Sequence, residues 1–314
     1  MKGIHNKYKL VSITVLLAIG MVAWQAFAGA LPYKFQILFF AAAIFTFGIP
    51  HGALDEVVEQ EVARRKQSSF QKIAFSFRYM GAITVYALCW YLFPQISLLA
   101  FLLMSSWHFG ETDFQQTQKI TTLGAFVTLF YGTSILLWII FTHADEAGVT
   151  LMQLVPPASV FHTYWLNGIS HKHIILTGSA FTIIAGLLFN QFTKKSQFSL
   201  QLILQLIVIL TCCYFLPLLP AFALYFAGWH SIITLYNIRN FINTAIDARH
   251  PASFKSLCLK AMPASLIAIS GLVLTGFLLN HYAPVFNPLP LLFVFLSLIT
   301  LPHIQVMHKL NVHL

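Results

Sequence analysis

The stretch FQILFFAAAIFTFGIPHGALDE, residues 35–56, decides how this chain folds. It contains an apolar run of about 19 residues, the length that a helix needs to cross a bilayer. Pro50 and His51 stand near the end of that run, and acidic residues follow at once. An ionisable side chain at membrane depth is costly, so we expect His51 in this position to face the interior of a helical bundle, to pair with another group, or to bind a ligand.

Apolar runs of this kind recur along the whole chain. Hydrophobic residues make up 58% of the sequence and charged residues only 9%, whereas soluble globular chains carry roughly 25% charged residues. We therefore predict an all-α, polytopic transmembrane helical bundle that forms a single integral membrane domain over residues 1–314. About ten helices (eight to ten) are expected, near residues 10–30, 35–53, 73–93, 95–110, 121–142, 173–192, 198–217, 219–237, 262–280 and 289–308. The most polar stretches are expected to be loops, near residues 54–72, 143–170 and 238–260.

The basic residues predict the orientation, because cytoplasmic loops collect Lys and Arg. With the N-terminus inside and ten crossings, all of the 18 basic residues except Lys34 and Lys172 fall on the inner side. This distribution predicts an N-in, C-in, multi-pass protein of the cell (inner) membrane. It also accounts for the net charge of +9, so we exclude nucleic acid as a partner.

Three further apolar segments carry a histidine at a similar depth. They are SSWHFGETD at 105–113, AGWHSI at 227–232 and TLPHIQ at 300–305, which contain His108, His230 and His303. Together with His51, these residues are expected in the cytoplasmic halves of four parallel helices, within about two turns of one another. A lone histidine of this kind can simply join two helices by a hydrogen bond. Four at one depth favour a shared transition metal, since imidazole suits Fe, Zn, Cu and Ni.

Two carboxylates stand on the same helix faces as these histidines. Asp55 follows His51 by four residues and Glu111 follows His108 by three. Carboxylates commonly accept the second ring N–H of a metal-ligating histidine, so we expect Asp55 and Glu111 to support the site. The alternative is a solvated residue at a helix end, and it is open for Asp55 and for Asp113.

The residues that precede the histidines also repeat. Pro50 and Pro302 directly precede two of them, and a proline inside a helix kinks it. Trp107 and Trp229 precede the other two and are predicted to shape a substrate cavity beside the metal. Ordinary irregularity and packing of membrane helices is the alternative for both features.

The motif GIPHGALDE and the three other histidine motifs quoted above resemble those of the Brp/Blh family of membrane-bound β-carotene 15,15'-dioxygenases. The resemblance extends over about residues 40–308. The resemblance implies a non-haem Fe(II) enzyme that splits the central double bond of β-carotene with O₂ into two molecules of all-trans-retinal. It implies that the catalytic iron ligands are His51, His108, His230 and His303. It further suggests a retinal-binding rhodopsin as acceptor of the product.

One departure from the family pattern concerns Thr234. The third motif usually continues as W-H-S-x-x-x-H, and this chain has Thr234 at the last position. Either the other four histidines hold the iron, or the chain is a divergent, non-catalytic carotenoid- or retinal-binding relative. We favour the first, because four nitrogens suffice and leave positions open for O₂. A histidine-dependent membrane transporter is a third hypothesis.

The hydroxyl of Thr234 is expected near the metal site without ligating it. Because Thr234 lies one turn after His230, it shares a helix face with that residue. Its hydroxyl can donate to the backbone carbonyl of the preceding turn, which satisfies it inside the membrane.

Overall fold

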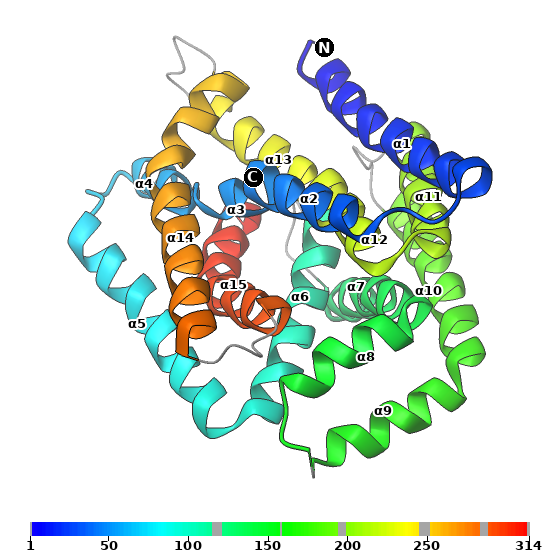
Figure 1. The fold of residues 1–314 in the computed structure, drawn as a ribbon. Helices are drawn as coiled ribbons and strands as arrows, with labels where there is room; N and C mark the ends of the chain where they lie inside the picture. The colour runs from blue at the N-terminus through cyan, green and yellow to red at the C-terminus, as the bar shows by residue number, and fades with distance from the viewer. Residues whose placement is uncertain are drawn as a thin grey trace.

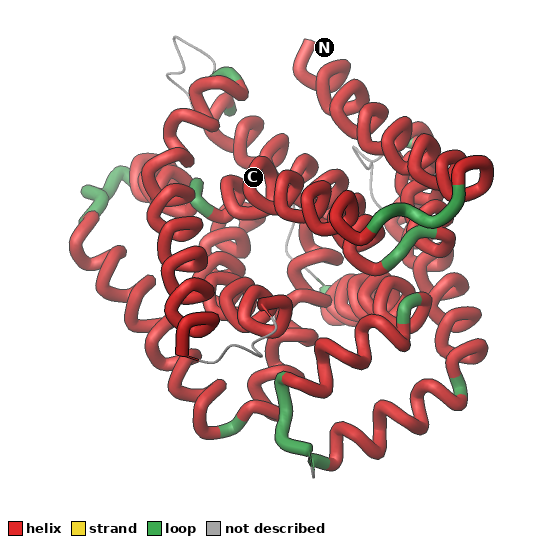
Figure 2. Tube along the Cα trace, viewed as in Figure 1, coloured by secondary structure: helices red, strands yellow, loops and turns green. Residues whose placement is uncertain are grey.

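The computed structural model describes residues 2–114, 121–157, 159–193, 199–244, 252–282 and 288–312, and these are almost entirely helical, without a strand (Figure 2). In this part of the chain eight helices are long and apolar enough to cross a membrane. The predicted all-α transmembrane bundle is therefore confirmed, and the chain is a membrane protein. The eight spans are Tyr8–Ala28, Tyr33–Arg65, Lys72–Leu92, Thr122–Thr142, Lys172–Phe192, Leu218–Asn243, Phe254–Leu279 and Leu289–Leu310.

Figure 1 shows how the helices are arranged. In chain order they are α1 (Lys2–Ala28), α2 (Tyr33–Ala43), the π-helix η1 (Ile44–Gly48), α3 (Ile49–Gly52), α4 (Asp55–Arg65), α5 (Lys72–Leu92), α6 (Pro94–Phe114), α7 (Thr122–Thr142), α8 (Ala144–Gln153), α9 (Val160–Ser170), α10 (Lys172–Thr193), α11 (Leu200–Phe215), α12 (Leu218–Tyr225), the π-helix η2 (Phe226–Ser231), α13 (Ile232–Asn243), α14 (Phe254–Tyr282) and α15 (Pro288–Val312).

Two of the ten predicted segments are helices that fall outside the eight spans. The second half of α6 carries polar residues from Ser105 to Asp113, which lower its hydropathy. Helix α11 has only 16 residues. The orientation of the bundle stays a prediction, and four of the basic residues that support it lie outside the described residues, namely Lys119, Lys194, Lys195 and Arg249.

The predicted loops are partly wrong. Most of residues 54–72 form α4, residues 143–170 contain α8 and α9, and α13 extends to Asn243. Helix α8 is amphipathic and buries Ala144, Ala147 and Leu151 against the bundle. A short amphipathic helix has too few apolar residues to resemble a membrane span, which is why the hydropathy pattern missed these elements.

The span made of α12, η2 and α13 forms the centre of the bundle. In its most apolar stretch 83% of the residues are buried, whereas the corresponding figure for α14 is 6%. Helix α14 therefore lies at the periphery, where it packs mainly against α3 and α15 (Figure 1). The central position of η2 places His230 in the interior of the protein.

Helices α6 and α7 pack against each other at glycines. A Cβ atom at Gly132 would lie 1.8 Å from the carbonyl oxygen of Ser106, and one at Gly110 would lie 2.1 Å from that of Thr128. Only hydrogen fits at these positions. Each helix thus presents two small residues four apart, the pattern that lets membrane helices approach closely. This contact fixes the part of α6 that carries His108.

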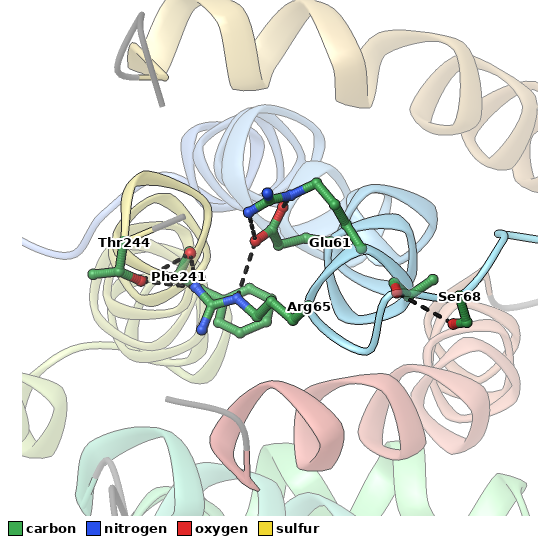
Figure 3. Close-up of polar contacts among 7 residues, drawn as sticks. Glu61, Arg65, Ser68, Phe241 and Thr244 are labelled. Carbon is green, nitrogen blue, oxygen red and sulfur yellow. Dashed lines mark hydrogen bonds and ion pairs between the residues drawn. The ribbon is translucent and has the colours of Figure 1, made fainter. Parts of the chain in front are cut away.

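A polar clamp joins the ends of α4 and α13 (Figure 3). The guanidinium of Arg65 donates to the backbone oxygen of Phe241, to Oγ1 of Thr244 at 2.8 Å and to Glu61 at 3.0 Å. It also covers the ring of Phe241, with its carbon 3.9 Å from the ring centroid. Because α4 follows His51 and α13 follows His230, the clamp fixes the relative position of two histidine-bearing segments.

Candidate metal centre and adjoining cavity

The helices are irregular at three of the four motif histidines. His51 lies in α3, directly after the π-helical η1, and His230 lies within η2. Pro302 lies inside α15 immediately before His303, where it removes one backbone hydrogen bond of the helix. The wider π-helical turns are frequently found at functional sites, because they redirect side chains that a regular helix would place elsewhere.

The four motif histidines converge in the interior. Their ring centroids are separated by 5.4 Å for His51 and His230, by 4.7 Å for His230 and His108, by 4.9 Å for His108 and His303, and by 5.0 Å for His303 and His51. Ligand nitrogens of the first three of these residues, His51, His108 and His230, lie within 4.8 Å of one another. All four side chains are buried.

The ring nitrogens at this point are largely unpaired. Among the described residues, both nitrogens of His108 and of His230 and Nε2 of His303 are buried without a hydrogen-bond partner. Nδ1 of His51 lies 3.3 Å from the backbone oxygen of Phe47. A carbonyl oxygen only accepts, so Nδ1 carries the proton there and Nε2 keeps its lone pair.

Asp55 and Tyr79 orient His303. Nδ1 of His303 lies 2.7 Å from Oδ1 of Asp55, and the hydroxyl of Tyr79 donates to Oδ2 of Asp55 at 2.9 Å. The carboxylate is buried. It fixes the proton of His303 on Nδ1 and turns the lone pair of Nε2 away from itself, as carboxylates beside metal-ligating histidines commonly do.

A large apolar cavity of about 570 Å³ adjoins the histidines. His51, His108 and His303 contribute to its wall, and most other lining side chains are aliphatic or aromatic. Phe226 also lines it and contacts the rings of both His51 and His230, with centroids 5.7 Å away in each case. The cavity volume lies within the range of small-molecule sites.

Comparison with known proteins agrees with this arrangement. The family model for beta-carotene 15,15'-dioxygenase matches residues 42–311. The chain belongs to this family. A beta-carotene 15,15'-dioxygenase from an uncultured marine bacterium, 66A03, is 36% identical over 73 residues, which is 23% of this chain and 26% of that relative. No solved structure matches.

The family's tryptophan positions do not line the cavity, so the prediction for Trp107 and Trp229 is wrong. Trp229 is fully buried, and its indole N–H donates to Oδ1 of Asp113 at 2.9 Å. Successive residues of a helix point about 100° apart, so a neighbour of a cavity-facing histidine generally points elsewhere. The aromatic residues beside the histidines are instead Phe109 and Phe226, and Phe109 could have been found from its place in the second motif.

Glu111 has a different partner from the one expected. Its Oε1 lies 2.9 Å from Nδ1 of His308, a half-exposed side chain, and its Oε2 is buried without a partner among the described residues. The expected bond from Glu111 to a motif histidine is therefore wrong. Glu111 shares a helix face with His108, because it lies about one turn later. Its side chain nevertheless extends toward α15, where His308 supplies the donor.

Asp113 is a buried carboxylate, and so is Asp55, which excludes the alternative of solvated helix ends. Asp113 is completely buried and accepts hydrogen bonds from Tyr131 at 2.8 Å and from Trp229. Asp113 thereby joins α6, α7 and η2, and its partner in η2 is Trp229, the residue that precedes His230.

Thr234 lies as expected. Its side chain is buried, and its hydroxyl donates to the backbone oxygen of His230 at 2.9 Å. This bond satisfies the hydroxyl without a metal.

The residues at the centre fit a transition metal. Buried polar atoms without partners are rare in proteins, and a cluster of unpaired imidazole nitrogens is the donor set that such metals prefer.

Proposed function

We propose that the chain cleaves the central double bond of β-carotene with O₂, at Fe(II) held by His51, His108, His230 and His303. The observation that carries the proposal is the cluster of unpaired imidazole nitrogens beside a large apolar cavity. Zinc fits the same ligands but has no redox chemistry, whereas the family name describes a dioxygenase. Iron, when bound, would supply the electron exchange with O₂ that the polyene itself does not undergo.

The reaction balances without a further reductant. One molecule of O₂ gives one oxygen atom to each carbon of the broken double bond, so both products are aldehydes. The residues of the chain then have separate tasks. The proton on Nδ1 leaves Nε2 of His51 and of His303 available as ligands, and Asp55 with Tyr79 holds the second of these rings in place.

The apolar lining has two roles in the proposal. It binds a hydrocarbon chain without leaving polar groups unpaired, and it keeps water from the reacting carbons. Phe226 and Phe109 cover His230, which limits the directions from which substrate can approach.

The test is iron content together with product formation. Protein purified in detergent and loaded with Fe(II) without air should hold one iron per chain and, once β-carotene and air are added, should release two molecules of retinal per molecule consumed. Chromatography and the absorption spectrum identify the product. An iron-loaded protein that leaves β-carotene intact would overturn the proposal.

A second candidate function is binding of a carotenoid or retinal without cleavage. Thr234 favours it, because the family motif noted above has a histidine there and the Thr234 hydroxyl is already used by the backbone. Carotenoid that copurifies in a fixed ratio and is not consumed after iron loading would support this candidate.

Three further features belong to the proposal: a single membrane domain, a location in the inner membrane, and transfer of retinal to a rhodopsin. The first two rest on the continuous run of apolar helices. The third is tested by adding a retinal-free rhodopsin and following the formation of its pigment.

A further inference from the structure

The mouth of the cavity is marked by the exposure of its lining residues. Of the described residues that line the cavity, five are exposed, and all five lie on α5 or α14. Two large ones are Met80, with 57% of its surface exposed, and Ile267, with 74%. The other three are Ser76, Ala264 and Gly271. A residue that lines a cavity and also reaches the outer surface stands at an opening.

This opening lies between two of the eight apolar helices that could cross a membrane. Helices α5 and α14 are both membrane-spanning by length and composition. The other lining residues include the histidines on α3, α6 and α15 and side chains of α7 and α8. The same cavity thus includes both the exposed residues of α5 and α14 and three of the motif histidines.

On the α14 side of the mouth, three small residues accompany Ile267. Ala264, Ala268 and Gly271 follow one another at spacings of four and three, which places them on one helix face. A Cβ atom at Gly271 would meet nothing within 4 Å. These small side chains leave room beside Ile267 for a slender, rigid hydrocarbon chain.

We propose that the gap between α5 and α14 is the lateral portal through which a long polyene passes from the bilayer into the cavity. The identity of the substrate rests on the function proposed above, whereas the portal rests on the exposure of the lining residues. An apolar chain that dissolves in the hydrocarbon core would reach this mouth without crossing water.

Two glycines of α14 give a matched test. Gly271 lines the mouth and Gly276 does not, and a Cβ atom would meet open space at both. With protein in lipid nanodiscs and β-carotene delivered from vesicles, Gly271→Trp should slow both carotenoid loading and retinal formation at least about tenfold. Gly276→Trp should leave both rates close to those of the native protein, and iron content should be unchanged in both variants.

Two outcomes would overturn the portal. In the first, both variants keep the rates of the native protein, and in the second, both are slowed to the same extent. A native protein that loads carotenoid but forms no retinal would contradict the proposed function alone, because the loading rates still test the portal. If Gly271→Trp does not fold, Met80→Trp on the α5 side of the mouth replaces it. Its control is Gly81→Trp, because Gly81 does not line the cavity and a Cβ atom there meets nothing within 4 Å.

Discussion

Oδ1 of Asp55 lies 2.7 Å from Nδ1 of His303, although 248 positions separate the two residues in the sequence. The bond joins the start of α4 to the middle of α15, and both partners are buried. It therefore has two effects, since it connects two distant segments and it selects which nitrogen of His303 can bind a metal.

Replacement of Asp55 by Asn should weaken iron binding roughly 10–100-fold, as changes in the partners of metal-ligating residues typically do. The shape is kept, but the charge that stabilises the Nδ1 proton of His303 is lost. Titration of the purified apoprotein with Fe(II) measures the effect.

Glu111→Gln is the matched control for this variant, because Glu111 is an equally buried carboxylate bonded to His308 rather than to a motif histidine. Its iron affinity should stay close to that of the native protein. Equal losses in both variants would contradict a special role for Asp55.

Replacement of any one of His51, His108, His230 or His303 by Ala should abolish cleavage and reduce the iron content. In the proposed site each ring supplies one iron ligand, so its removal leaves an incomplete ligand set. Elemental analysis and the retinal assay give the two readouts. The control is His171→Ala, at an exposed histidine that bonds to nearby residues, and it should retain iron content and retinal formation. If a motif variant also retains iron content and retinal formation, its histidine does not belong to the ligand set.

Thr234→Ala should keep the iron and most of the activity, because the Thr234 hydroxyl is bonded to the backbone and not needed by a metal. Thr234→His should bind iron more tightly by adding an imidazole one turn after His230. Iron content and retinal yield distinguish the outcomes. If only Thr234→His holds iron or releases retinal, the native chain is the non-catalytic relative.

Gly132→Ala should destabilise the protein by about 1–3 kcal/mol or more, since the added methyl group meets the backbone of α6 and overpacks the contact. The midpoint of thermal unfolding in detergent should fall, and iron binding should weaken because α6 carries His108. Gly81→Ala introduces a methyl group into open space and serves as control. An unchanged midpoint for Gly132→Ala would show that the two helices can separate without cost.

The sequence alone predicted the fold class and the four histidines. Apolar runs long enough to cross a bilayer identify helices directly, because backbone groups in lipid must be paired within each segment. The cost of a histidine at membrane depth singles out the motif residues. The amphipathic helices α8 and α9 were missed, since helices of 10 and 11 residues have too few apolar residues to resemble a membrane span.

Side-chain direction is where prediction from the sequence failed. Trp229 and Glu111 adjoin motif histidines in sequence, yet one bonds to Asp113 and the other to His308. The spacing of residues gives a helix face but not the neighbouring helix that the face meets. Tyr79 was missed for the same reason, because its partner Asp55 lies on another helix.

The sequence by itself thus determined that this is a helical membrane protein with four costly histidines at one depth, since both follow from the free energy of placing side chains in lipid. Only the tertiary structure decided that their rings meet, that Asp55 and not Glu111 orients one of them, and that the cavity opens between α5 and α14. These features depend on which helices pack together. That is set by close contacts between different helices, such as the one between Gly132 of α7 and Ser106 of α6.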